Sequence, residues 1–255
     1  MKVLAAALAV TVLGATASLD RQHAPLLAIL ANDPDDAGVC SPEQLQTAAR
    51  TADVKIADLV LGGDLVLYAV QHPCLCGAQN CPYYLVRVSA HAKPRLVFKT
   101  YAIAVRTAPQ TGSLIDLIVD AHDSALVTDE TRYIYAYGRY QPLRSERIRN
   151  TDRARKPDGV AVRFAPGSST ALLHGSASLG WYDSYAFDAA KGQQLLIDGV
   201  RSRANLSLTL FGPDGKPFDL RAGVPLALPV SGRYQLHVEN GAEQDLPYAL
   251  TLAIR

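Results

Sequence analysis

Stretches in which apolar and polar residues alternate recur along most of the chain, and such alternation predicts strands. In residues 206–211, three leucines alternate with two hydroxyl-bearing residues, as expected for a sheet with one face on a core and the other toward water. Other strands are predicted over 65–70, 83–88, 101–105, 114–119, 132–137 and 139–143, with a tight reversal at Gly138 between the last two. The chain is therefore predicted to be mainly β.

One short helix is predicted in the first half of the chain. Ser41 is a capping residue, Pro42 suits the first helical position, and Gln44 stands three residues after the cap. The helix is expected to run to about Arg50. With the strands that follow, this predicts an N-terminal antiparallel β domain over 18–143.

The last part of the chain, 159–255, contains short strands at regular spacing. Turn signals separate them at 165–167, 212–215 and 230–232. This spacing predicts a C-terminal β-sandwich of the jelly-roll kind. Tyr185, Phe187 and Tyr234 are expected in its core, and Gly192 in a turn.

Residues 144–158 separate the two predicted domains and carry six basic and three acidic residues with almost nothing apolar. This composition predicts a solvated linker. The alternative is a basic patch that touches cell wall or an anionic polymer.

The N-terminus has the pattern of an export signal. Lys2 precedes an apolar run over 3–13, and Ala15 and Ala17 supply the small residues that signal peptidase accepts. A signal peptide over 1–17 is predicted, with cleavage after Ala17. The run is too short for a permanent span and no cysteine follows it for a lipid anchor, so a periplasmic or secreted protein without a membrane anchor is expected.

Four cysteines lie in the N-terminal half, and an oxidising compartment makes two disulfides the expectation. Cys74 and Cys76 alternate across a strand and are poorly placed to bond each other. Two pairings remain open: Cys40–Cys74 with Cys76–Cys81, which we favour, or Cys40–Cys76 with Cys74–Cys81. The alternative use of the thiols is a zinc site that includes His72.

Charge and motifs give no sign of catalysis. The 25 basic and 24 acidic residues nearly balance, so no nucleic-acid partner is expected. Residues 175–180 lack the spacing of a nucleophile elbow, and Asp120, His122 and Asp123 follow an apolar strand, where polar residues commonly end the strand and satisfy the turn. No catalytic residue, metal site or cofactor is predicted, and the chain is not expected to be an enzyme.

The C-terminal domain shows its motifs in order at 182–187, 190–193, 228–234 and 248–254. In these residues it resembles the periplasmic inhibitors of g-type lysozyme, which share a sandwich with the bacterial pre-peptidase C-terminal domain. The resemblance implies a protein that binds and inhibits a lysozyme or another muramidase. The alternative that it implies is a cell-envelope accessory module, which binds glycan or protein without inhibiting anything.

One segment departs from the inhibitor pattern. Where such inhibitors are expected to carry an extended loop rich in Arg and Asn, residues 239–245 are compact and acidic. An acidic loop suits the cleft of a cationic muramidase, and the alternative is a solvated hairpin. The expected partner contacts are Trp181, Tyr182, Asn240, Glu243 and Asp245, with peptidoglycan as a second partner; the alternative for the two aromatic residues is a place in the core.

The N-terminal domain resembles small exported domains that include i-type lysozyme inhibitors and immunity proteins. The residues concerned are 62–70, the cysteine cluster with 82–84, and 138–140. Many such domains hold calcium in a turn before the strand. Here Leu59, Val60 and Leu61 replace the oxygen ligands, so no calcium site is predicted.

Overall fold

The computed structural model describes residues 13–56, 65–89 and 91–255. The chain divides into two compact units. The N-terminal unit comprises Met1–His122 and Arg132–Leu143, and the C-terminal unit comprises Asp123–Thr131 and Arg144–Arg255. The prediction of a mainly β protein with antiparallel sheets is confirmed.

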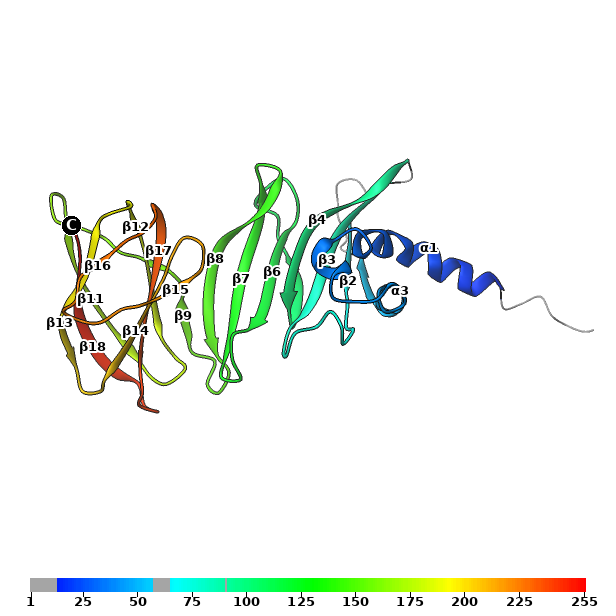
Figure 1. The fold of residues 1–255 in the computed structure, drawn as a ribbon. Coiled ribbons are helices and arrows are strands. Elements are labelled where there is room, and N and C mark those ends of the chain that lie inside the picture. Colours follow the sequence, from blue (N-terminus) through cyan, green and yellow to red (C-terminus); the bar gives the residue numbers. More distant parts are fainter. Residues whose placement is uncertain (1–12, 57–64, 90) are drawn as a thin grey trace, which may run out of the picture. The chain divides into compact units, whose positions relative to one another are not determined.

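The N-terminal unit is built on an antiparallel four-stranded sheet in the order β1-β2-β3-β4 (Figure 1). Its strands are β1 (Asp53–Ile56), β2 (Leu65–Ala69), β3 (Cys81–Ser89) and β4 (Ala92–Ala102). Three helices precede it: α1 (Leu13–Leu30), α2 (Pro34–Ala37) and α3 (Pro42–Thr51). The predicted cap of α3 is confirmed, since Ser41 and Gln44 form a capping box and Pro42 opens the helix.

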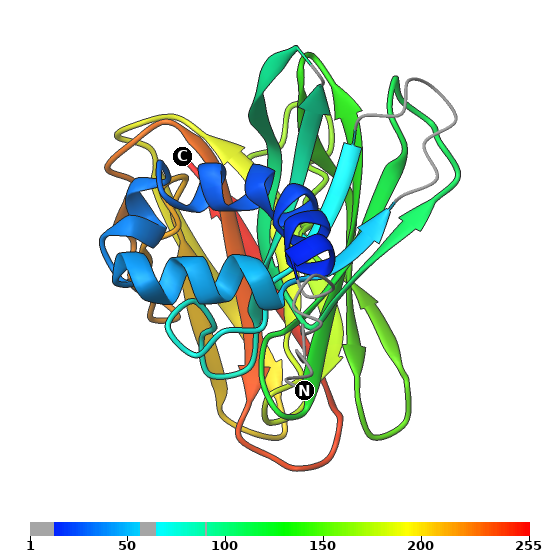
Figure 2. The same ribbon diagram turned by 90° about the vertical axis from the view of Figure 1, so that its right-hand side faces the viewer.

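Alternation along β2 and β3 sends side chains to two different cores. Tyr68 and Tyr84 are buried with residues of α1 and α3, which lie side by side (Figure 2). Leu67 and Leu85 face the other way and pack with strands β5 (Ala104–Ala108) and β6 (Asp116–His122). The sheet therefore has helices on one face and strands on the other.

Three details of this unit differ from the prediction. The helices α1 and α2 were not predicted. Proline is disfavoured inside helices, and Pro25 lies inside α1. The strand expected over 101–105 is the end of β4 and the start of β5, because the chain changes sheet at Ile103. Residues 1–12 and the turn at 59–61 lie outside the described residues, so the signal peptide and the missing calcium site stay predictions. None of the described helices is long and apolar enough to cross a membrane.

Both disulfides adopt the favoured pairing. Cys40 bonds Cys74, which ties the segment before α3 to the loop after β2, and Cys76 bonds Cys81. Cys40 is buried in the helical core. All four thiols are used in these bonds, so the zinc alternative is wrong.

The segment predicted as a solvated linker is an ordered hairpin. Strand β8 (Arg139–Arg149) continues six residues beyond the expected domain boundary, and β9 (Arg155–Pro157) returns antiparallel to it with Arg147 opposite Lys156. These are the last two strands of a five-stranded sheet with the order β5-β6-β7-β8-β9, in which β7 is Val127–Ala136. The predicted reversal at Gly138 is confirmed, with positive φ at Tyr137 and Gly138.

The C-terminal unit contains the predicted sandwich of two facing sheets (Figure 1). One sheet has the order β10-β12-β17-β14-β15 and the other β11-β18-β13-β16. Their bounds are β10 Val160–Ala161, β11 Thr170–Ala177, β12 Asp183–Ala189, β13 Gln194–Ser202, β14 Leu206–Phe211, β15 Pro217–Asp219, β16 Leu226–Ala227, β17 Gly232–Asn240 and β18 Leu246–Ile254. Tyr185, Phe187 and Tyr234 lie in the core as predicted, and Gly192 turns the chain with φ +88°.

Gly175 in β11 leaves room for the partly buried carboxylate of Asp183. A Cβ at this position would collide with the Asp183 carboxylate and crowd the Tyr248 hydroxyl, which donates to that carboxylate over 2.7 Å. Gly175→Ala is expected to lower the free energy of unfolding by about 2 kcal/mol through overpacking. Urea unfolding tests this, with Gly241→Ala as the control, because a Cβ there meets nothing within 4 Å.

Candidate partner-binding site

Three cations from the hairpin β8–β9 converge on the single tryptophan of the chain. Arg147 and Arg149 are two residues apart on one strand, and Lys156 stands opposite Arg147, so all three project from one face of the hairpin. Their charged groups lie 5.4, 5.1 and 5.0 Å from the centre of the Trp181 ring. Each is within the range of a cation–π contact. Trp181 follows β11 in a turn and is buried, with 3% of its surface exposed.

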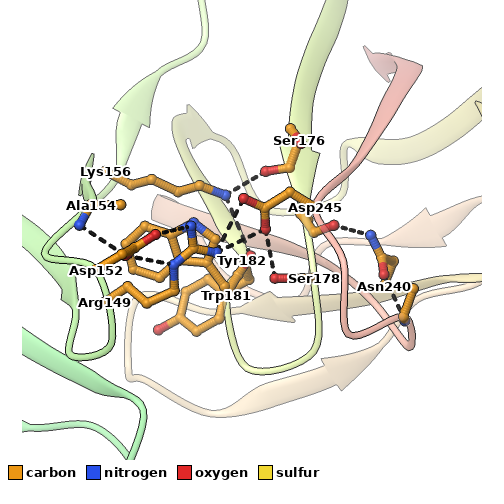
Figure 3. A network of polar contacts seen from close by, with 12 residues as sticks. Arg149, Asp152, Ala154, Lys156, Ser176, Ser178, Trp181, Tyr182, Asn240 and Asp245 are labelled. Carbon is orange, nitrogen blue, oxygen red and sulfur yellow. Dashed lines mark hydrogen bonds and ion pairs between the residues drawn. The ribbon is translucent and has the colours of Figure 1, made fainter.

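Carboxylates pair with Lys156 and Arg149, and Figure 3 shows Arg149 between Asp152 and Asp245. Lys156 pairs with Asp183 at 2.8 Å, and Arg149 is shared between Asp152 at 2.8 Å and Asp245 at 3.0 Å. Burial alone would raise the pKa of Asp245, but hydrogen bonds from Ser178 and Arg149 hold it below its usual value. Asp245 is therefore held as an anion at the end of the loop between β17 and β18.

This β17–β18 loop, residues 241–245, is fastened to the turn that carries Trp181. The Leu179 amide donates to the Ala242 carbonyl at 2.8 Å, and the Ser178 hydroxyl donates to Asp245 at 2.7 Å. At the loop's start Asn240 is fully buried, where it donates to the Ala177 carbonyl and accepts from the Ala242 amide. The loop is held by backbone and side-chain bonds at both ends.

A pocket of about 220 Å³ opens beside the loop. Leu126 and Leu179 form apolar walls, and their side chains are 46% and 56% exposed. Trp181, Arg149, Asp152 and Glu243 also line it, and Glu243 is exposed. Among the described residues Glu243 has no ion-pair partner, in contrast to Asp152 and Asp245.

A second cluster surrounds Tyr182 in the same unit. The Arg147 guanidinium lies 3.1 Å from the centre of the Tyr182 ring, and the His237 ring stacks on Tyr182 at 4.0 Å. Arg147 is only 1% exposed and donates to the Tyr182 carbonyl at 2.6 Å, while Asp123 and Asp129 lie 3.6 and 3.8 Å away. Burial raises the pKa of Asp129 to about 6, with repulsion from Asp123 adding to the effect.

No family model matches the chain, and no curated protein matches it. The solved structures that are similar to part of it include three periplasmic inhibitors of g-type lysozyme named PliG. A mutant of the Escherichia coli inhibitor is 26% identical over 38% of this chain and 98% of its own, with a TM-score of 0.33. The inhibitors from Salmonella Typhimurium and Aeromonas hydrophila are 24% and 25% identical over 39% and 38% of this chain and 100% and 96% of their own, with TM-scores of 0.33 and 0.31.

These structures belong to the inhibitor class that the C-terminal sequence resembles. At such TM-scores the likeness carries no conclusion about function, which has to come from the residues of this chain. The resemblance of the N-terminal domain to i-type inhibitors stays a prediction.

The five predicted contact residues differ in burial and fall into three groups. Trp181 and Asn240 are buried and have almost no surface to offer a partner, which corrects their expected role as direct contacts. Tyr182 is half-buried between Arg147 and His237. Glu243 and Asp245 are exposed, and both belong to the β17–β18 loop. The structure therefore brings all five together around one loop and its supporting turn.

Sequence reasoning missed the residues that support this loop. Arg147, Arg149 and Lys156 fall in the segment predicted as a linker, where their charge favoured solvent exposure. A signal was present, since Arg147 and Arg149 flank the apolar Ile148 in strand-like alternation.

The other chemical motifs have structural roles in their own units. Asp120 forms a two-bond ion pair with Arg106 at 3.0 and 3.1 Å, and the His122 amide donates to Asn80. Residues 175–177 end β11, and residues 178–180 form the turn before Trp181, with positive φ at Gly180.

The stability of the C-terminal unit is expected to depend on His237 at acidic pH. Burial lowers its pKa to about 4; the Asp158 and Asp123 carboxylates oppose this shift and Arg147 adds to it. A neutral buried histidine contributes stability that is complete above the unfolded pKa of 6.5 and is lost as pH falls from 6.5 to 4. His237→Phe keeps a ring on Tyr182 and removes this titration.

Thermal unfolding between pH 4 and 7 measures the effect. The variant should gain melting temperature relative to the wild type as the pH falls below 6.5. Both proteins share Asp129, whose raised pKa acts in the opposite direction, so its effect cancels in the difference. The same change at the exposed His174 should show no such trend, and parallel curves for wild type and His237→Phe would contradict the prediction.

The order of the β17–β18 loop is expected to depend on Arg149. Arg149→Ala removes the ion pairs to Asp245 and Asp152, so hydrogen exchange of the amides in 241–245 should accelerate about tenfold. Arg155→Ala is the matched control, because Arg155 is likewise shared between two carboxylates, Glu130 and Glu146. Equal exchange in the two variants would show that the loop does not need Arg149.

Proposed function

We propose that the protein is an exported inhibitor of a lysozyme or another peptidoglycan muramidase, and that the β17–β18 loop makes the decisive contact. The observation that carries the proposal is the acidic loop held in place at both ends, with Glu243 exposed, lining a pocket and without an ion-pair partner among the described residues. A loop ordered before binding loses little conformational entropy on association. It therefore suits insertion into a preformed cleft.

The negative charge of the loop indicates that it fits a positively charged surface. Glu243 and Asp245 present carboxylates that attract a cationic enzyme and accelerate encounter. Inside a muramidase cleft Glu243 would compete with the catalytic carboxyl chemistry for hydrogen bonds. Asp245 is held by Arg149 and Ser178, whereas Glu243 has no ion-pair partner in the part of the chain that the structure describes, so Glu243 is the carboxylate available to the enzyme.

Export rests on two features. The predicted signal peptide over 1–17 directs the chain out of the cytoplasm. The two disulfides of the N-terminal unit are of the kind that forms and persists in oxidising compartments. N-terminal sequencing of the protein recovered from the periplasm or medium should begin at Ser18.

Lysis assays test the inhibitor function. Purified mature protein at micromolar concentration is added to g-, i- and c-type lysozymes and to a bacterial muramidase, each acting on peptidoglycan. Suppression of one class is the expected result and identifies the partner. If none is suppressed while the protein is retained on insoluble peptidoglycan, the accessory-module alternative replaces the inhibitor.

A further inference from the structure

We infer that the pocket beside the β17–β18 loop receives one arginine or lysine side chain of the partner protein. The inference deepens the proposed function, on which it rests for the identity of the partner, by naming the group that the partner supplies. The pocket is lined by residues of one unit only, from the segments 126–127, 149–152, 178–181 and 243.

The size of the pocket suits a single side chain. Its volume of about 220 Å³ is far larger than the space that one water molecule occupies. It is smaller than typical small-molecule sites, whose volumes start at about 300 Å³. A side chain carried by a folded partner needs no larger space, because the partner's own surface covers the opening. This is the geometry of an anchor residue in a protein interface.

The lining combines apolar walls with polar and charged residues, one of which is the carboxylate of Glu243. Leu126 and Leu179 are exposed walls that would cover the methylene stem of a long basic side chain. Glu243 lines the pocket and has no ion-pair partner among the described residues, so it can accept hydrogen bonds from the charged head.

The remaining charges leave the pocket selective for a cation. Arg149 lines the pocket, but its guanidinium is already bound by Asp152 and Asp245 in pairs of 2.8 and 3.0 Å. An acidic side chain would meet Glu243 and Asp152 without a free cation to bind. A neutral side chain would leave Glu243 desolvated and unpaired, which costs free energy.

Trp181 makes occupancy measurable without any lysozyme, because it lines the pocket and is the single tryptophan. The probe is N-acetyl-arginine methylamide, titrated against the full mature protein while tryptophan fluorescence is recorded at constant ionic strength. A saturable change is expected, and Glu243→Gln should weaken the apparent affinity about fivefold. Leu179→Ser should weaken it too, through the lost apolar wall.

Asp188→Asn is the matched control, since Asp188 is an exposed carboxylate on β12 that does not line the pocket. It should bind the probe as the wild type does. An unsaturable change, an equal response to N-acetyl-leucine methylamide, or an unchanged affinity in Glu243→Gln would overturn the assignment.

The two proposals fail separately. If a lysozyme is inhibited equally by wild type and Glu243→Gln, and the probe does not bind, the pocket assignment is wrong and the inhibitor function stands. If the probe binds through Glu243 but no lysozyme is suppressed, the inhibitor function is wrong. If Glu243→Gln lowers retention on insoluble peptidoglycan instead, the cation comes from stem-peptide amines and a protein donor is excluded.

Discussion

Replacing Cys40 and Cys74 by serine is expected to lower the free energy of unfolding of the N-terminal unit by about 4 kcal/mol. The bond joins residues 34 positions apart, and in the chain-entropy account a disulfide stabilises by restricting the unfolded chain, more so for a longer loop. Cys40 is also buried in the helical core, so serine there adds a polar group to an apolar site. Urea unfolding of the double variant measures the loss.

The second disulfide provides the internal comparison. Cys76 and Cys81 are only five positions apart, so their replacement by serine should cost about 2 kcal/mol. Both double variants remove one bond and add two hydroxyls. Equal losses, or a larger loss for the shorter loop, would show that loop length does not govern the stabilisation.

Glu243→Lys is expected to weaken inhibition of the target muramidase about 100-fold. The substitution places a cation where the partner's own cation should enter, and a like-charge contact at an interface costs several kcal/mol. The side chain is exposed and has no ion-pair partner within the described residues, so folding should be unaffected. Inhibition constants and melting temperatures of wild type and variant are to be measured together.

The control for this experiment is Asp188→Lys, which makes the same change of charge elsewhere on the sandwich. It should lower only the salt-dependent part of the association rate. An equal loss in both variants would show that net charge, and not the position of Glu243, determines inhibition.

Much of the fold could be predicted because local patterns agree with the tertiary structure. The alternation of Leu206, Leu208 and Leu210 with hydroxyl residues is that of a strand with one face on the core, and β14 is such a strand. The Ser41 cap and the reversal at Gly138 are decided within four residues of sequence.

The hairpin β8–β9 was missed because its only local signal, the alternation around Ile148, is weak beside the high charge of the segment. Its charged side chains look solvated in sequence, and only the tertiary structure shows Arg147 buried against Tyr182 and Trp181. The same holds for the candidate site. The acidic character of residues 239–245 was evident, but the burial of Trp181 and Asn240 depends on partners far away in sequence, such as Lys156 and Ala177.

The most direct test of the proposed function is a titration of lysis rate against the concentration of purified mature protein, with the g-type, i-type and c-type enzymes in parallel. Wild-type protein is expected to suppress one class completely at about equimolar concentration. Glu243→Lys is expected to abolish this suppression at the same concentration. Undiminished lysis by every enzyme at a large excess of wild-type protein would contradict it.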